Sequence, residues 1–188
     1  MWAKVESGSV TEIYTRPKQL TIGDVQYPKN IFELWSKSEL EAIGIYEVEI
    51  DNTNLKDQGY YTNTNQSFSF GSGKVTASYG TATAMSLNDS GSGENIVRGL
   101  KYIHKANINN NAASLLVKHD WMSIREAEGG TAMPSDIKTW RASVRTKANA
   151  MCTQIDNVSD VDALAALYVY NSDDPPVRPL GEFPDEPS

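Results

Sequence analysis

The sequence predicts an α+β protein: a small antiparallel β-rich part with one short helix, a C-terminal three-helix part, and an extended acidic proline-rich tail. Apolar residues recur at every second position before residue 85 and at every third or fourth position after residue 95. Residues 86–95 (SLNDSGSGEN) contain no aromatic or β-branched residue, which is typical of a linker. We therefore expect a β-rich domain over 1–85, a linker over 86–95 and a helical domain over 96–171.

The tail, residues 172–188, is set apart by its composition. It holds five acidic residues and five of the chain's eight prolines. Such a segment cannot build a core of its own and should be extended. We expect it to lie on a neighbouring subunit, with Val177, Leu180 and Phe183 making the contacts, because these are its bulky apolar residues.

The β-rich part is predicted to consist of short strands joined by glycine turns. Three hairpins are expected, over residues 2–14, 20–27 and 68–79, each with a glycine at the turn, where a positive φ is needed. Ser38 and Glu41 have the spacing of a capping box, which predicts a short helix ending at Gly44. Residues 45–50 alternate apolar and acidic side chains, as a half-buried strand does.

Three helices are predicted in the second half. Apolar spacing predicts one from about residue 94 to residue 126, which Gly129 and Gly130 follow. A second begins at Pro134 and runs to about residue 155, and a third opens at Ser159. Trp121 closes the first helix in this scheme, so we expect its ring to be buried against Leu116 and the second helix.

Composition excludes several classes of protein. The net charge of −7 disfavours a general nucleic-acid binder. No apolar run approaches the roughly 20 residues that span a bilayer, and the first residues lack the apolar region of a secretory signal. The single cysteine, Cys152, excludes an intrachain disulfide and any zinc site with two cysteines.

Catalytic chemistry is poorly supported. His104 and His119 would lie about 22 Å apart along one helix and cannot share a metal ion. The close acidic pairs, near residues 126 and 160, flank a glycine loop and a helix start, where acids commonly stabilise helix ends. We therefore expect no catalytic, cofactor or metal site, and no enzyme.

One alternative is a carbohydrate-binding module that recognises a host glycan. Aromatic rings on alternate strand positions can form a sugar-binding face, although they more often belong to a core. The candidates are Tyr60, Tyr61, Phe68, Phe70 and Tyr79.

Residues 115–145 resemble the phage tail assembly chaperones and tail-fibre assembly proteins. Members of that family carry a Leu-Leu-x-x-Thr-Asp-Trp segment, then a proline, then an aromatic-Arg-x-x-x-Arg helix. Here Leu-Leu-Val-Lys-His-Asp-Trp occupies residues 115–121, with His119 in place of the usual threonine. Pro134 follows, and then Trp140 with Arg141 and Arg145. Residues 27–46, 75–79 and 159–164 resemble the same small tail proteins more loosely.

The resemblance implies a non-enzymatic protein that binds a tail-fibre or baseplate protein, without a cofactor. Such a protein would act in the virion tail, or in the host cytoplasm during assembly, as part of a larger and possibly homo-oligomeric assembly. Asp120, Trp121, Arg141 and Arg145 are its candidate partner-binding residues. Asp120 is expected to pair with one of the two arginines, and we favour Arg145 inward and Arg141 outward, facing the partner.

Overall fold

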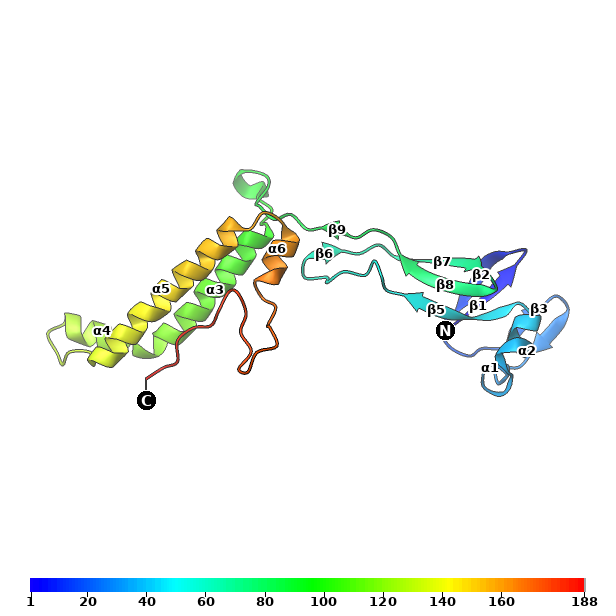
Figure 1. Cartoon of the computed structure of the whole chain (residues 1–188), viewed down its shortest axis with the longest axis horizontal. Helices are drawn as coiled ribbons and strands as arrows, with labels where there is room; N and C mark the ends of the chain where they lie inside the picture. Colours follow the sequence, from blue (N-terminus) through cyan, green and yellow to red (C-terminus); the bar gives the residue numbers. More distant parts are fainter. Residues whose placement is uncertain (188) are drawn as a thin grey trace. The chain divides into compact units, whose positions relative to one another are not determined.

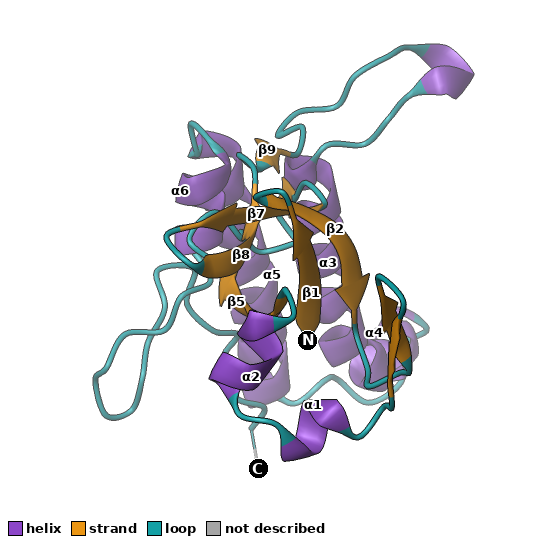
Figure 2. Ribbon diagram, turned by 90° about the vertical axis from the view of Figure 1, so that its right-hand side faces the viewer, coloured by secondary structure: helices purple, strands orange, loops and turns teal. Residues whose placement is uncertain are grey.

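The computed structural model describes residues 1–187 and has the predicted α+β composition, with 37% of residues in helices and 22% in strands. It divides into two compact units, Met1–Thr83 and Ala84–Ser188. The main sheet belongs to the first unit (Figure 1), and the long helices belong to the second (Figure 2). The boundary thus falls after Thr83, where the sequence placed it after residue 85.

The first unit is built on a five-stranded sheet with the order β2-β1-β5-β8-β7. The strands are β1 (Trp2–Glu6), β2 (Ser9–Tyr14), β5 (Ile45–Asp51), β7 (Gln66–Gly71) and β8 (Lys74–Tyr79). The sheet is antiparallel except for β5 and β8, which run parallel and pair Val48 with Val75. After β5 the chain forms the edge strand β7, and the β7–β8 hairpin then places β8 between β7 and β5. A purely antiparallel sheet was therefore the wrong expectation.

Each face of this sheet covers a separate core. The hairpin of β3 (Leu20–Ile22) and β4 (Val25–Tyr27) lies on one face with helices α1 (Ile31–Leu34) and α2 (Lys37–Ala42). The core there contains Tyr14, Leu20, Ile31, Phe32, Leu40 and Ile45. The other face carries Ala3, Val48, Val75 and Ala77, and the edge strands β2 and β7 approach each other around it.

The helical segment of this unit differs from the prediction in two ways. It forms two short helices, not one, separated by the extended residue Trp35. The capping box uses Ser36 and Glu39, two residues earlier than predicted: the Ser36 N–H donates to the Glu39 carboxylate at 2.7 Å. Gly44 follows α2 with a φ of +79°, and a Cβ there would lie 2.9 Å from the Val5 carbonyl oxygen, so glycine is required.

The unit boundary carries a further pair of short strands. Strands β6 (Tyr61–Thr62) and β9 (Thr83–Ala84) pair with each other. Residues 86–95, expected to be a linker, contain the short 3₁₀-helix η1 (Gly93–Asn95). The Ser86 and Leu87 carbonyls accept the first two N–H groups of the following helix, from Leu100 and Lys101. This segment therefore caps the helical unit and is part of it.

The second unit contains more helical segments than the three predicted. They are α3 (Leu100–Leu116), the 3₁₀-helix η2 (Val117–His119), α4 (Asp120–Ala127), α5 (Ser135–Asn157) and α6 (Val161–Ala166). The single helix expected over 94–126 was wrong, because η2 interrupts it at 117–119. The asparagine run at 109–111, which is poor helix material, stays within α3.

The tail packs on its own helical unit. It forms neither helix nor strand over residues 172–187, as its prolines predict. However, Leu180 is fully buried, with its N–H bonded to the Leu167 carbonyl at 3.0 Å, and the Trp140 indole N–H donates to the Pro184 carbonyl at 3.0 Å. Leu180 is thus a core residue of this chain and not a contact to a neighbour. Val177 remains exposed, and Phe183 is half-buried.

Replacing Leu180 with alanine should destabilise the helical unit. Truncation of a fully buried leucine costs about 2–5 kcal/mol, through lost burial and the cavity that remains. Thermal unfolding followed by circular dichroism should show a lower melting temperature. Val177→Ala is the matched control, since Val177 is 53% exposed in the same tail. Equal melting temperatures for the two variants would show that the tail is not anchored by Leu180.

Candidate functional site

The junction between α3, α4 and α5 is organised by the guanidinium of Arg141. Its Nη1 donates to the Leu116 carbonyl, and its Nη2 donates to Asp120 Oδ1 at 2.6 Å. The Arg141 side chain is 5% exposed. Leu116 ends α3, where the last carbonyls have no partner within the helix, and Asp120 begins α4. One buried cation therefore joins the end of one helix to the start of the next.

The two arginines occupy the reverse of the expected positions. Arg141 points inward and Arg145 is exposed. The reason lies in the register of α5: at 100° per residue Arg141 lies at the edge of the arc of buried positions, and Arg145 lies about 40° beyond it. Asp120 does pair with an arginine, as expected, but the partner is Arg141.

Trp121 is 53% exposed, so its predicted burial was wrong. Asp120 and Trp121 begin α4 and do not end α3, because η2 intervenes. Val117 and Ile124 are also exposed, at 61% and 58%. Trp121 and Ile124 are three residues apart in α4 and share one face, and Val117 lies in the preceding η2; we name these three exposed side chains the α4 stripe.

The ring of Trp121 is held in place by a neighbour one turn along the helix. The Arg125 guanidinium lies 4.8 Å from the Trp121 ring centroid, a cation–π contact. Arg125 is fixed in turn, because its Nε donates to the Thr131 carbonyl at 2.9 Å. A large apolar ring is therefore presented to solvent in a defined position.

The end of the tail is tied to η2 by charge. The Glu186 carboxylate accepts from Lys118 and contacts His119 Nε2, both at 2.9 Å. Hydrogen bonds from these two residues hold the pKa of Glu186 below its usual range. The His119 ring also meets the Trp140 ring edge-on at 5.6 Å. The tail thus passes over α5 and ends beside the α3–α4 junction.

The residues that were weighed for chemistry have structural partners. His104 Nδ1 lies 2.8 Å from the Tyr168 hydroxyl, and burial lowers the pKa of His104. Asp160 caps α6 by accepting from the Ala163 N–H at 2.8 Å. Burial raises the pKa of the Cys152 thiol, which disfavours the reactive thiolate. Among residues 1–187, no three His, Cys, Asp or Glu side chains form a group that could hold a metal ion.

Acidic pairing near residue 126 is also structural. Glu126 contacts the Lys138 ammonium at 3.1 Å across the Gly129–Gly130 turn. A hydrogen bond from that lysine lowers the pKa of Glu126, so the carboxylate stays ionised at neutral pH. It therefore joins α4 to α5 and does not resemble a general acid.

Two of the five aromatic rings considered for sugar binding pack into the interior of the β-rich unit. Phe68 and Phe70 pack against the core cluster around Val75, and Phe70 meets Tyr46 with ring centroids 4.8 Å apart. Tyr61 is half-buried, with the Lys56 ammonium 5.8 Å from its ring centroid. Interior packing thus uses two of the five candidate rings.

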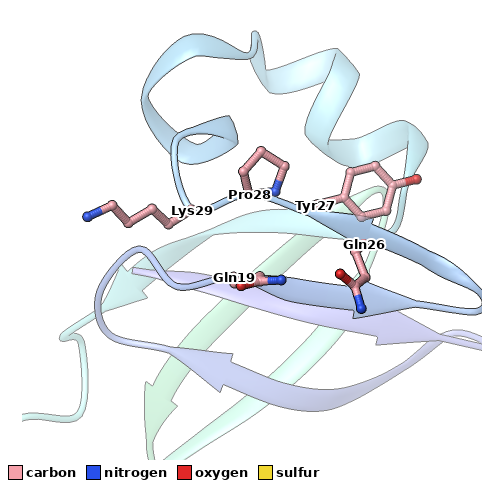
Figure 3. A pocket seen from close by; sticks show the side chains of 5 residues that line it. All are labelled: Gln19, Gln26, Tyr27, Pro28 and Lys29. Atoms are coloured by element: carbon pink, nitrogen blue, oxygen red, sulfur yellow. The ribbon is translucent and has the colours of Figure 1, made fainter.

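A hollow of about 450 Å³ lies beside the β3–β4 hairpin (Figure 3). Gln19, Gln26 and Tyr27 line it, with Pro28 and Lys29. Figure 3 shows Lys29 extending in the opposite direction from Tyr27. The Tyr27 ring packs edge-on against Trp35. We assign no function to this hollow.

Comparison with known proteins gives no relative on which to base a function. No protein-family model matches the chain, and neither the curated proteins nor the solved structures yield a match. Within residues 1–187, no helix combines the length and apolar character needed to cross a membrane.

Sequence reasoning missed the inward position of Arg141, although a signal was present. The buried positions of α5 after Trp140 follow steps of three and four, and Arg141 fits that series. A charged residue in an apolar series indicates a buried, partnered cation. The break at η2 had no comparable signal, because it depends on where the Leu116 carbonyl finds its hydrogen bond.

Removing the guanidinium should loosen the α3–α4 junction. Arg141→Ala deletes two charge-assisted hydrogen bonds made by a buried side chain, each worth about 1.5–3 kcal/mol. We expect a lower unfolding free energy by chemical denaturation. Arg145→Ala, the exposed neighbour on the same helix, should unfold like the wild type. A stable Arg141→Ala protein would contradict the structural role of this residue.

Proposed function

We propose that the protein is a non-enzymatic bacteriophage tail protein that binds a tail-fibre or baseplate protein through the α4 stripe. It acts as an assembly chaperone or as a permanent adaptor in the virion. The tail-protein part of this proposal rests on the resemblance of residues 115–145 to that family. The binding part rests on the exposure of Trp121, Val117 and Ile124.

The observation that carries the proposal is the exposure of Trp121. A tryptophan is costly to leave half in water, and it is among the residues most enriched at binding hot spots. Its ring is held by Arg125, so little side-chain freedom would be lost when a partner covers it. A pre-positioned aromatic ring flanked by two aliphatic side chains is typical of a protein-binding surface.

The family-like residues divide between support and contact. Leu116, Asp120 and Arg141 join α3 to α4 from the inside, while Trp121 points out from the first turn of α4. The junction therefore sets the direction of the ring. Asp120 and Arg141, which are 21 residues apart in the chain, therefore act together to support Trp121.

Trp121→Ala tests the proposal, because it should separate binding from folding. Trp121 is half exposed and its ring contacts the Arg125 guanidinium, so the purified variant should melt close to the wild-type temperature, with a change in unfolding free energy of about 1 kcal/mol or less. Loss of a hot-spot tryptophan costs about 2 kcal/mol or more, roughly a thirtyfold loss of affinity. Phage carrying the variant should show fewer attached fibres and slower adsorption.

Tyr102→Ala provides the matched control. Tyr102 is another exposed aromatic residue of the same unit, 46% exposed on α3 and outside the α4 stripe. Phage with this variant should adsorb normally. Normal fibre occupancy in Trp121→Ala phage would remove the α4 stripe from the binding site, and normal virions after deletion of the whole gene would defeat the tail-protein proposal.

A further inference from the structure

We propose that a hollow in the β-rich unit binds a quaternary ammonium group, the head group of choline and its esters. The hollow has a volume of about 170 Å³ and lies between the sheet and helices α1 and α2. The rings of Trp2, Phe32 and Trp35 line it, together with the side chains of Glu47 and Lys37. This site is distinct from the α4 stripe and does not depend on the proposed tail function.

The aromatic rings of the hollow are held by their neighbours. The Trp2 ring lies 4.7 Å from that of Phe32, measured between centroids, with the planes tilted by 53°. The Trp35 ring meets Tyr27 edge-on, at 5.7 Å and 84°. Phe32 is itself a buried core residue. Because packing sets these ring positions, little order would be lost when a ligand enters.

Glu47 places a negative charge beside the rings. It pairs directly with Trp2 in the antiparallel β1–β5 ladder, so the two side chains leave the sheet on the same face. Among the ion pairs formed by residues 1–187, none includes Glu47, whereas its neighbour Glu49 contacts Lys74 at 3.0 Å. The Glu47 carboxylate is therefore available to a cation from outside the chain.

Lys37 is the one positively charged side chain among the residues that line the hollow, and it would repel a bound cation. Its ammonium lies 3.8 Å from the Glu41 carboxylate, and its side chain is 59% exposed. Solvent and the adjacent carboxylate both screen it. The attraction from Glu47 and the rings is therefore not cancelled by Lys37.

A quaternary ammonium group suits this lining better than a sugar does. Aromatic faces attract cations, and rings grouped around a site are a recurring way to recognise quaternary ammonium ligands. Such a group has no hydrogen-bond donors that need partners. A sugar bound here would find Glu47 and Lys37 as its charged partners, and the other lining side chains offer only the indole N–H groups of Trp2 and Trp35, which leaves hydroxyls unpaired at a cost.

Calorimetric titration of the full chain with choline chloride tests the inference, at constant ionic strength maintained with sodium chloride. The control ligand is 3,3-dimethylbutan-1-ol, which has the shape of choline without its charge. We expect saturable binding of choline and about tenfold weaker binding of the neutral alcohol. Equal affinities would show an apolar hollow with no preference for a cation and would overturn the proposal, as would the absence of choline binding.

Two variants locate the site. Glu47→Gln should weaken choline binding about tenfold and leave the neutral alcohol unaffected. Glu49→Gln makes the same change two residues along β5, outside the hollow, and should bind choline like the wild type. Trp35→Leu, with its fold checked by circular dichroism, should weaken choline binding as well. Wild-type choline affinity in the Glu47→Gln protein would overturn the assignment.

A further arm of the experiment identifies the source of the head group. Sedimentation with phosphatidylcholine vesicles that is lost in Glu47→Gln would assign it to a lipid. Binding of soluble choline phosphate without vesicle binding would assign it to a soluble or polymer-attached ester. Either result supports recognition of the quaternary ammonium group, and failure of both ligands to bind would refute it.

Discussion

The helical unit depends on one buried cation. Arg141 donates hydrogen bonds to the Leu116 carbonyl at the end of α3 and to the Asp120 carboxylate at the start of α4. Without this contact, the end of α3 and the start of α4 would each lose a link to α5. The guanidinium is suited to this task because its rigid fork of donors can serve two acceptors at once. The break between α3 and α4, and with it the direction of Trp121, follows from this geometry.

The same junction is reinforced from the outside by the tail. Leu180 fills the core beside α6, Pro184 accepts from Trp140, and Glu186 contacts η2 through Lys118 and His119. An acidic proline-rich segment that could not fold alone is ordered here because it adds one buried leucine and a carboxylate bonded to Lys118 and His119. The other exposed residues of the tail, including Val177, take no part in these three contacts.

Local patterns predicted much of the fold. The α+β composition, the hairpins around Gly8, Gly23 and Gly73, and the stop at Gly44 follow from periodicity and turn chemistry, which act over a few residues. The parallel pairing of β5 with β8 could not be predicted in this way, because it depends on how β7 enters the sheet edge. Pairing between distant segments is decided by the whole sheet.

The candidate site was predicted in its residues but not in its geometry. Asp120, Trp121 and Arg141 were all selected, yet the tryptophan and the arginine exchanged their expected environments. The Arg141 error came from the register of α5, and the Trp121 error came from treating residues 94–126 as one helix, whereas η2 separates α3 from α4. The hollow around Trp2 and Trp35 was not selected at all, because its walls come from β1, β5, α1 and the α1–α2 connection, segments that only the folded sheet brings together.

Hydrogen–deuterium exchange of the protein, with and without the proposed partner, a purified tail-fibre or baseplate protein, tests the proposed binding surface most directly. The measurement reads the whole backbone, so it does not depend on the choice of a variant. We predict slower exchange on complex formation in residues 117–125, with little change in the middle of α5. A stable complex that leaves residues 117–125 unprotected would contradict the assignment of the α4 stripe as the binding surface.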